Sequence, residues 1–535
     1  MEKRALLAIV LSLGVILFFN YLYMKLFSSS KYENIRSYKE FQVQKIEKEE
    51  VSKDLLKDQK SSEIKEKYKI LEEGSQIYWI NSPKYTATLS SLGVRFETFT
   101  LKNYAKKRGE KEEINLVSGA PESLPLEIYL ESSPEVAIIN YQGPEKTNYI
   151  FEKGDTEYLV FRTTFKELLL EKKLIFKKDS YFIDMNFKVL NLGKVPVKDR
   201  VLLRGAFSPF ADGTKYVFKG PFYYTNHLNE VKIKNELEEY SGFLKYLGYE
   251  DTYFIVALIP DNLGNINYRA TFRNLNKNLQ EFILWLPPFE LAPQQEITYK
   301  FKVYMGPKKI EEMKKEYPLL GKALYFGIFD FIAKPLLYTL KFIHKFTGNF
   351  GWDIIFITIV LRIFFFPLNH MSYKSMKKMQ EIQPIIQKLR EKYKDDPQTL
   401  NKELMNIYKT YKINPFSGCL PILIQIPIFI AMYKVLLMAI ELRHAPFWLW
   451  ISDLSAPERF YGIPLLTILM GVSMFVQQKL SPPSTDPLQN KIMLLLPLIF
   501  IILFMNFPSG LVLYWFVNNI LSIIQQIFTL RLAKK

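Results

Sequence analysis

Long apolar blocks constrain this chain of 535 residues more than any other feature of its sequence. Residues 5–23 carry no charged side chain and follow Lys3 and Arg4. Five further apolar blocks lie at 352–368, 419–440, 463–478, 492–506 and 510–528. A helix needs about 20 apolar residues to cross the hydrocarbon core of a bilayer. The pattern therefore predicts six transmembrane helices, with a long hydrophilic segment between the first and the second.

The first block has two interpretations, an uncleaved anchor or a signal peptide. A signal peptide has an apolar core of about 7–15 residues that ends near a small-x-small cleavage site. The block at 5–23 is longer, Lys25 follows it, and only weak cleavage candidates come next. We expect an anchor at 1–25 and then a charged, solvated linker at 26–75.

Basic residues in the loops set the orientation of the predicted helices. Residues 369–417 contain ten Lys and Arg, whereas residues 441–462 contain two. Cytoplasmic loops carry an excess of Lys and Arg, so the first of these loops is expected in the cytoplasm. Alternation of the spans then places both termini in the cytoplasm and exports the segment between the first two spans.

The exported segment shows the period-two pattern of β-strands. Between Tyr181 and Val189 apolar side chains alternate with polar ones, as in a strand with one buried face. Similar runs lie at Tyr158–Thr164, Tyr253–Ile259, Phe282–Leu286 and Ile297–Met305. The pattern predicts an antiparallel β-sandwich over residues 76–306. No convincing catalytic constellation is visible in it, so we do not expect an enzyme.

Within the region 307–349, residues 319–345 are hydrophobic but interrupted, so a span is not expected there. The interruptions are Lys322, Asp330, Lys334 and Lys341, and Pro335 is expected to break the helix midway. The apolar residues near helical spacing are Leu320, Leu324, Ile328, Phe331 and Ile332. We predict an amphipathic helix that lies on the outer membrane surface.

Arg362 is the most informative single residue, because it lies near the middle of the second predicted span. An arginine at this depth costs about 2.5–3.5 kcal/mol on insertion scales, so it is rarely retained facing lipid. The predicted spans contain no central Asp or Glu, and Asp353 lies toward the outer edge. We therefore interpret Arg362 as part of a hydrophilic groove that is open to the cytoplasm and receives an anion transiently.

Other polar residues fall at helical spacing on the predicted spans and define the rest of the candidate groove. They are Thr358 and Asn369 on the helical face of Arg362, Gln425, Ser473 with Gln477, and the stripe Tyr514, Asn518, Ser522 and Gln525. The alternative is that each residue only hydrogen-bonds neighbouring helices, at about 0.6 kcal/mol apiece. The predicted spans at 463–478 and 492–506 are also short, and short spans thin a bilayer locally.

The cytoplasmic loop carries two helical stripes on either side of a turn at Asp395, Asp396 and Pro397. The stripes are Met376, Met379, Ile382, Ile386, Leu389 and Tyr393, and then Leu400, Leu404, Ile407, Tyr408 and Tyr411. They predict a helical hairpin at residues 370–414. Its apolar faces either pack on each other, which is the commoner arrangement, or offer a Met-rich surface to varied hydrophobic segments.

Motifs of redox, metal and nucleotide chemistry are absent from the sequence. The chain has one cysteine and four scattered histidines, no Gly-Lys pair precedes Ser or Thr as a P-loop requires, and no GxSxG occurs. We expect no cofactor, no metal and no catalytic residue. The net charge of the chain is +17, and we expect no sequence-specific contact with nucleic acid.

Four segments resemble the YidC membrane-insertase family of bacteria, which is related to the Oxa proteins of mitochondria. They are the span Trp352–Pro367 with Arg362, the run from Ser375-Met376 to Gln383-Pro384, the stretch Asn414–Pro421 leading to Gln425–Phe429, and Phe507–Leu511. The resemblance is strong over about residues 320–530 and weaker in the exported segment. With its anchor and its exported segment, the chain is similar to the form of the family found in bacteria with two membranes.

The resemblance implies an inner-membrane insertase and chaperone that moves nascent hydrophobic segments from the cytoplasm into the membrane, without nucleotide hydrolysis. It implies an insertase core at 350–535 and a periplasmic, supersandwich-like domain in an α+β membrane protein. Arg362 would be the groove arginine, with Thr358, Gln477, Tyr514 and Trp515 along the substrate path. The insertase would act alone or with the Sec translocon.

The expected partners are nascent membrane proteins, Sec translocon components, the lipid bilayer and the ribosome. The tail Arg531–Lys535 is short, so ribosome contact is expected through the cytoplasmic loops. Two alternatives remain open. A secondary transporter should show repeated halves and paired ionisable groups, and a membrane-tethered carbohydrate-processing enzyme should show a carboxylate pair in the sandwich.

Overall fold

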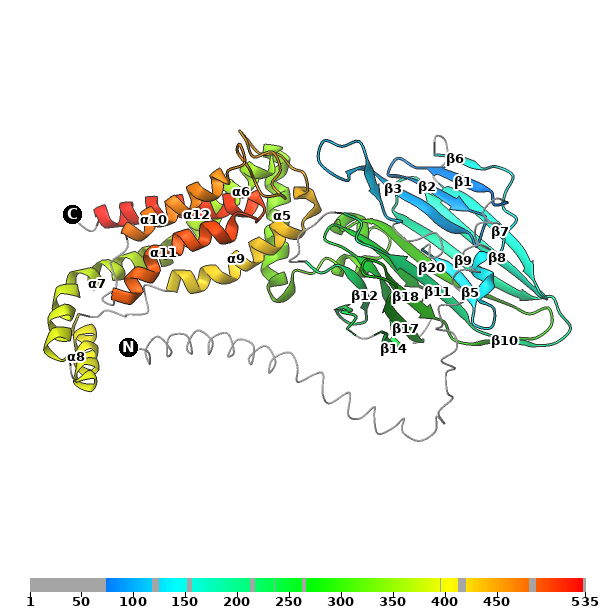
Figure 1. The fold of residues 1–535 in the computed structure, drawn as a ribbon, viewed down its shortest axis with the longest axis horizontal. Coiled ribbons are helices and arrows are strands. Elements are labelled where there is room, and N and C mark those ends of the chain that lie inside the picture. Colours follow the sequence, from blue (N-terminus) through cyan, green and yellow to red (C-terminus); the bar gives the residue numbers. More distant parts are fainter. Residues whose placement is uncertain are drawn as a thin grey trace. The chain divides into compact units, whose positions relative to one another are not determined.

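The computed structural model describes most of the chain after residue 73. The described residues are 74–117, 125–151, 156–211, 217–234, 236–261, 266–394, 396–411, 420–480 and 487–532. The predicted anchor at 1–25 and nearly all of the linker at 26–75 lie outside the described residues. The rest forms a β-rich part followed along the chain by a helical part (Figure 1).

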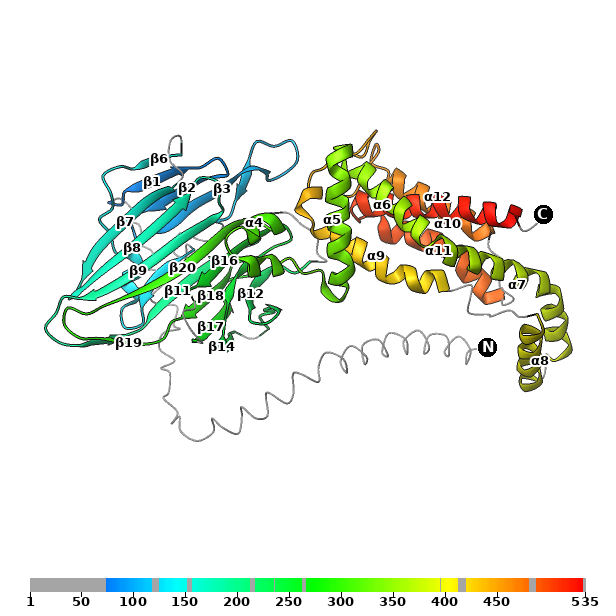
Figure 2. The same cartoon turned by 180° about the vertical axis from the view of Figure 1, so that it is seen from behind.

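The largest sheet of the β-rich part has eight antiparallel strands, and Figure 2 shows its long members side by side. Their order is β13 (Leu228–Glu230), β12 (Gly220–Tyr224), β15 (Tyr246–Glu250), β16 (Phe254–Pro260), β20 (Glu296–Pro307), β9 (Phe182–Asn191), β8 (Leu168–Lys177) and β7 (Thr156–Phe165). The predicted alternation around Tyr181–Val189 is confirmed, because buried and partly exposed residues alternate along most of β9. The other four predicted runs fall on β7, β16, β18 (Gln280–Trp285) and β20.

Two five-stranded sheets and a two-stranded one complete the β-rich part. The first has the order β14 (Glu238–Phe243), β17 (Asn267–Asn274), β18, β11 (Val201–Phe207) and β5 (Glu127–Leu130). The second has the order β4 (Glu113–Asn115), β3 (Arg95–Ala105), β2 (Tyr85–Ser90), β1 (Ile77–Asn81) and β6 (Asn148–Ile150). The pair is β10 (Val197–Asp199) with β19 (Phe289–Leu291). The prediction that all strands pair antiparallel was wrong at one place. Strand β6 returns by a long connection and pairs with β1 in parallel.

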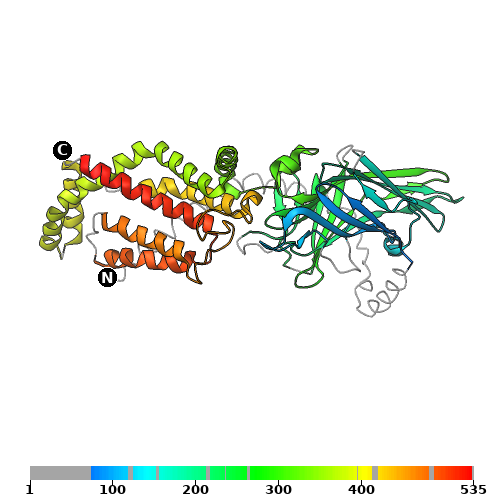
Figure 3. The ribbon, with the colours of Figure 1, turned by 90° about the horizontal axis from the view of Figure 1, so that it is seen from above.

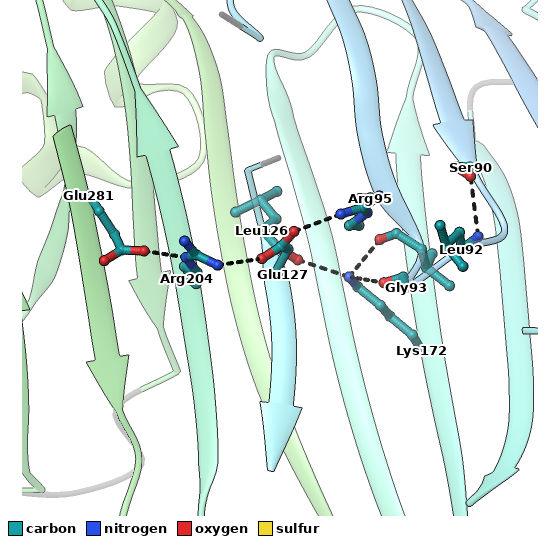
Figure 4. A network of polar contacts seen from close by, with 10 residues as sticks. Ser90, Leu92, Gly93, Arg95, Leu126, Glu127, Lys172, Arg204 and Glu281 are labelled. Carbon is teal, nitrogen blue, oxygen red and sulfur yellow. Dashed lines mark hydrogen bonds and ion pairs between the residues drawn. The ribbon is translucent and has the colours of Figure 1, made fainter. Parts of the chain in front are cut away.

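A buried ionic network joins these sheets (Figure 4). Glu127 on β5 accepts hydrogen bonds from Arg95 on β3 at 2.7 Å and from Arg204 on β11 at 3.3 Å. Arg204 also pairs with Glu281 on β18. The side chains of both glutamates are fully buried, and burial raises the pKa of Glu127 while the two arginines lower it. Only such close partners make a buried carboxylate tolerable.

Lys172 on β8 extends the network to the eight-stranded sheet (Figure 4). Its Nζ donates to the backbone carbonyls of Val94 at 2.6 Å and Leu126 at 3.0 Å. Burial lowers the pKa of this lysine to about 7, against the opposing effect of Glu127. Three sheets therefore meet at one cluster of charges, and loss of one member leaves another charge buried without its partner.

Replacing Glu127 by alanine is expected to destabilise the β-rich part by about 3–5 kcal/mol, the usual cost of breaking a buried ion pair. Denaturant unfolding of the full-length protein, followed by the circular dichroism of the sheets, measures this. The matched control is Glu290→Ala, which removes an exposed pair with Lys198 and should cost under about 1 kcal/mol. Equal stabilities for the two variants would contradict the role assigned to the network.

The segment that follows β20 begins with short helical pieces and ends in one long helix. They are α4 (Ile310–Lys314), η5 (Pro318–Lys322), η6 (Gly327–Phe329) and α5 (Asp330–Thr347). The expected break at Pro335 was wrong, because α5 continues through it. A proline removes one backbone hydrogen bond, and the buried residues of α5 hold the helix together despite this loss. Those buried residues are Ala333, Leu336, Leu337 and Leu340.

The expected apolar face of this segment was also wrong in detail. Leu320 and Leu324 are buried before α5 begins, whereas Ile328 and Phe331 are exposed. The spacing was counted as one continuous helix, but the turn between η5 and α5 changes the direction in which each residue points. Helix α5 does have one buried and one exposed face, and the exposed face carries the apolar side chains of Phe331, Phe342 and Phe346.

The helical part then continues with seven α-helices among the described residues. They are α6 (Phe350–Phe364), α7 (Phe366–Lys392), α8 (Pro397–Thr410), α9 (Leu420–Met438), α10 (Leu465–Leu480), α11 (Pro487–Phe504) and α12 (Ser509–Leu532). Within the bundle, α12 packs on four other helices, namely α6, α7, α9 and α10. In Figure 3, α12 (red) lies between the yellow-green helices and the orange pair.

Length and composition identify few complete membrane spans in the described residues. Ser509–Thr529 is long and apolar enough to cross a membrane, and α6 with the start of α7 would be a second span bent by 64°. Shorter apolar helices lie at Gln425–Met438, Leu465–Leu480 and Met493–Phe504. The predicted apolar blocks after residue 350 thus coincide with helices, several of them shorter than a full span.

Helices α7 and α8 form the predicted hairpin. Asp396 caps α8, since its side chain accepts hydrogen bonds from the backbone of Gln398 and Thr399. Ile382 and Ile386 of α7 are buried against Leu404, Ile407 and Tyr408 of α8. The two stripes therefore pack on each other, the commoner of the two arrangements considered.

Candidate functional site

The guanidinium of Arg362 lies inside the bundle and is held by backbone rather than by an acid. Arg362 is on α6 and is partly buried. Its Nη2 donates to the backbone carbonyl of Asn518 on α12 at 3.3 Å, and its buried Nε has no hydrogen-bond partner among the described residues. Tyr373 and Tyr514 are close enough to act on its charge.

Asp353, the acid closest to Arg362 along its helix, has other partners. Its buried carboxylate lies 2.7 Å from Nδ1 of His344 on α5 and also accepts from the hydroxyl of Thr347. Within the described ranges, no carboxylate lies within salt-bridge distance of Arg362. The guanidinium therefore has no permanent counter-ion in the part of the chain that the structure describes.

A bend of 64° follows Arg362, where α6 ends at Phe364 and α7 begins at Phe366. Pro367 in the first turn of α7 cannot donate a backbone hydrogen bond, which favours a break at this point. Gln525 on α12 donates to the carbonyl of Phe366 at 3.2 Å and so holds α12 against the bend. Helical spacing alone had placed Asn369 on the face of Arg362, but Asn369 lies beyond the bend.

Two further predicted residues, Gln425 and Tyr514, bind each other. The side-chain amide of Gln425 on α9 donates to the hydroxyl of Tyr514 on α12 at 2.9 Å. Thr358 is buried on α6, one turn before Arg362, and its hydroxyl donates to the carbonyl of Ile354 on the same helix. The structure thus brings Arg362, Gln425, Tyr514 and the backbone of Asn518 together through α12, whereas Thr358 bonds within its own helix.

Trp515 belongs to an aromatic cluster rather than to the polar stripe. Its ring centroid lies 4.5 Å from that of Phe429 on α9, 5.1 Å from Phe500 and 5.0 Å from Phe504 on α11. These contacts join α9, α11 and α12 by apolar surface. Gln477 on α10 is partly buried, and its side chain also has an interaction partner.

Sequence reasoning missed a second polar face of α12. Asn519 donates to the hydroxyl of Ser473 on α10 at 3.1 Å, and Gln526 donates to the carbonyl of Leu480 at 2.8 Å. The adjacent pairs Asn518-Asn519 and Gln525-Gln526 were the available signal, because neighbours in a helix point about 100° apart. One member of each pair faces α6 and α7, and the other faces α10.

Buried polar atoms without a hydrogen-bond partner among the described residues lie on both polar faces of α12. Nε of Arg362 and Oε1 of Gln525 lie on the side of α6 and α7, whereas Oε1 of Gln526 lies on the side of α10. Buried polar atoms are almost always satisfied by protein or by ordered water. Their presence in an apolar bundle favours a hydrated interior around Arg362.

Electrostatically, the arrangement suits transient binding of an anion. The candidate site offers one permanent positive charge with neutral polar neighbours and no carboxylate that would compete for it. Among the described residues, no group of three or more His, Cys, Asp or Glu could hold a metal ion. The chemistry on offer is hydrogen bonding and charge attraction, not bond cleavage.

Two family models match the chain, and together they cover most of it. The model described as 60Kd inner membrane protein matches residues 342–535, and the model described as YidC periplasmic domain matches residues 78–339. The border between the two matches falls within α5.

The chain is also similar, over most of its length, to proteins that carry the name membrane protein insertase YidC. It is 38% identical over 476 residues to the membrane protein insertase YidC of Pelobacter propionicus, across 84% of this chain and 85% of that protein. It is 36% identical over 483 residues to the membrane protein insertase YidC of Syntrophobacter fumaroxidans, across 86% and 87%. The crystal structure of an active YidC insertase with its first transmembrane domain resolved shares 19% identity, a TM-score of 0.37, and coverage of 87% of this chain and 97% of that one.

A double-mutant cycle on Gln425→Leu and Tyr514→Phe is expected to give a coupling energy of about 0.6 kcal/mol, up to about 1.7, as for hydrogen bonds between membrane helices. The phenylalanine keeps the ring contact of Tyr514 with Phe429 and removes only the hydroxyl. Thermal unfolding of the full-length protein in detergent gives the four stabilities. Additive effects of the two changes would mean that this hydrogen bond does not join α9 to α12.

Proposed function

The chain belongs to the YidC family of membrane protein insertases, and on this premise we propose which of its residues receive a nascent segment. Its function is the insertion of membrane proteins, its location is the inner membrane, and its β-rich part is the periplasmic domain. Nascent membrane proteins are therefore its substrates. It is an insertase and not an enzyme, as the names of its relatives indicate.

The receiving site we propose is the polar side of the bundle around Arg362, with Thr358, Gln425, Gln477, Tyr514, Trp515 and Asn518 along the path. The observation that carries this proposal is that the guanidinium has a backbone carbonyl, and no carboxylate of the described residues, as its partner. An acidic residue in the short polar tail of a client can pair with Arg362 while the tail crosses the membrane. Nε of Arg362 and Oε1 of Gln525, both buried and without a hydrogen-bond partner among the described residues, support a hydrated path.

The strength of this pairing decides whether a client can leave again. Two unit charges at 4 Å attract by about 1 kcal/mol in water and by about 4 kcal/mol at the effective dielectric constant of a protein surface. That range corresponds to roughly 5-fold to 1,000-fold in affinity, enough to draw a tail into the bundle without trapping it. Water in the groove keeps the attraction between the two charges near the lower end of this range.

The apolar part of the client leaves the groove sideways into lipid. Val360, Ile363 and Phe364 expose large apolar side chains on α6 next to Arg362, so a segment displaced from the arginine meets a surface that lipid can share. Six spans are proposed, namely residues 5–23 with α6, α9, α10, α11 and α12. The shortness of the apolar stretches in α10 and α11 supports local thinning of the membrane, which lowers the barrier for a polar tail.

No nucleotide hydrolysis by this protein is required in the proposed mechanism. The free energy comes from transfer of the client's apolar side chains out of water, at about 0.8 kcal/mol for each buried methylene group. Arg362 contributes only to the passage of the polar tail. The proposed insertase therefore catalyses partitioning, and it must release its client unchanged.

The topology and the remaining partners are proposals as well. Ten Lys and Arg in residues 369–417 support a cytoplasmic position of the hairpin α7–α8 and of both termini. The same basic hairpin is the proposed contact for the ribosome, and insertion is proposed to occur alone or beside the Sec translocon. A transporter and a carbohydrate-processing enzyme are not favoured, because the relatives at 36–38% identity are insertases.

Arg362→Ala is expected to lower insertion of a one-span client with an acidic tail about tenfold, which corresponds to about 1.4 kcal/mol of lost attraction. Arg362→Lys, which keeps the charge, should retain most of the activity. The measurement is protease protection of the client after insertion into vesicles that contain the purified full-length protein.

Two controls isolate the electrostatic contribution of Arg362. Lys479→Ala removes the same charge from an exposed position at the end of α10 and should leave insertion unchanged. Neutralising the acids in the client's tail should abolish the difference between the wild type and Arg362→Ala. Full insertion of the acidic client by Arg362→Ala would refute the electrostatic part of the proposal.

A photoreactive amino acid at position 425 or 477 is expected to crosslink to a stalled nascent client far more than one at position 498. Gln425 and Gln477 are partly buried on the proposed path, whereas Leu498 is exposed on α11. Gel mobility of the crosslinked products measures the yield at each position. Equal yields at all three positions would show that clients do not follow this path.

A further inference from the structure

A second polar feature lies outside the proposed path, in the segment between the β-rich part and the bundle. Helices α4, η5 and α5 line a half-open cavity of about 440 Å³. Its walls are Ile310, Lys314, Pro318, Leu319, Gly321, Lys322, Lys334 and Tyr338. Three of these eight residues are lysines, and no acidic residue is among them.

The lysines of the cavity are poorly neutralised. Lys334 pairs with Asp330 one turn earlier on α5 at 2.8 Å. Lys314 and Lys322 are exposed, and no carboxylate of the described residues lies within salt-bridge distance of either. Three lysines and one aspartate leave a net charge of +2 at the cavity.

Nearby acids do not change this balance, because each has another cation as its partner. Glu311 pairs with Lys341 at 2.6 Å, and Glu312 pairs with Lys84 at 2.5 Å. Glu316 pairs with Lys177 at 2.5 Å. The acids of α4 and of the turn after it are therefore directed away from the cavity.

Gly321 allows Lys314 to lie across η5 toward the cavity. A Cβ atom at position 321 would stand 2.6 Å from both Cγ and Cε of Lys314. Only glycine permits this close approach of the lysine stem. The contact brings the aliphatic stem of Lys314 against Gly321, next to the cavity that both residues line.

An apolar stripe on α5 continues from the same cavity. Phe331, Tyr338, Phe342 and Phe346 are 44–76% exposed and fall at helical spacing along one face. The rings of Phe342 and Phe346 contact each other at 5.2 Å. Tyr338 belongs both to this stripe and to the cavity wall, so the cationic and apolar surfaces are continuous.

We propose that the cavity binds the phosphate headgroup of an anionic glycerophospholipid from the periplasmic leaflet, with the acyl chains along the aromatic stripe of α5. A net charge of +2 favours a headgroup without an ammonium, such as phosphatidylglycerol, over zwitterionic phosphatidylcholine. The proposal rests on the proposed position of α5 at the periplasmic surface. Its readout is lipid occupancy, which is separate from the insertion assay, so either proposal can fail alone.

The experiment uses the full-length protein with Cys419→Ser, which removes its only cysteine, and a fluorophore attached at Phe342→Cys. The protein is reconstituted in phosphatidylcholine vesicles that contain a minority of phosphatidylglycerol, and one of the two lipids carries brominated acyl chains that quench the fluorophore. Quenching then reports which lipid lies beside α5. The same fluorophore at Leu498→Cys on α11 reports the bulk composition.

Phosphatidylglycerol should be enriched roughly 25-fold beside position 342, taking about 1 kcal/mol for each of the two free lysines, and not beside position 498. Lys314→Gln with Lys322→Gln should abolish the enrichment, and Lys314→Arg with Lys322→Arg should retain it. Lys232→Gln with Lys234→Gln is the matched control, because it removes two exposed lysines of the β-rich part and should change nothing.

Three outcomes would overturn the proposal. Quenching at position 342 that follows the mole fraction of each lipid would show no selective site. Equal loss of enrichment in the control pair would assign it to the overall charge of the protein. Displacement of the lipid by millimolar inorganic phosphate would show that the cavity binds a free phosphate instead.

Discussion

The contact between the guanidinium of Arg362 and the backbone of α12 is the interaction on which the functional bundle depends. A charge in an apolar bundle must find hydrogen-bond acceptors, and here the acceptor is a carbonyl that cannot lose or gain a proton. A carboxylate partner would have held the arginine in a closed pair. The backbone acceptor stabilises the side chain and leaves its charge available, so the same contact supports the packing of α6 on α12 and the proposed attraction of clients.

Local periodicity predicted the helices and strands well, but it could not predict how elements far apart in the chain pair with one another. The alternation along β9 and the apolar blocks of α9, α10, α11 and α12 are properties of single elements, so their positions follow from the residues themselves. The parallel pairing of β1 with β6 and the meeting of three sheets at Glu127 depend on residues far apart in the chain. Neither leaves a local pattern in the sequence.

The candidate site was predicted in part for the same reason. The stripe on α12 identified Tyr514 and Asn518, and the unpaired state of Arg362 followed from the lack of acids in the predicted spans. The bend after Phe364 removed Asn369 from the expected face, and the acceptor at Asn518 proved to be its carbonyl and not its side chain. A contact to the backbone cannot be inferred from the type of side chain at that position.

Two polar faces on α12 also determine which helix of the bundle is least restrained. Rotation of α12 about its axis would break its bonds to α6 and α7 on one side or to α10 on the other. The described side chains of α11, by contrast, hold their neighbours through apolar and aromatic contacts alone, including the fit of Ile501 over Gly471. The position of α11 is therefore set by the shapes of packed side chains and not by polar partners. The bundle thus combines one helix whose rotation is restrained by hydrogen bonds on two sides with another whose described side chains depend on close packing alone.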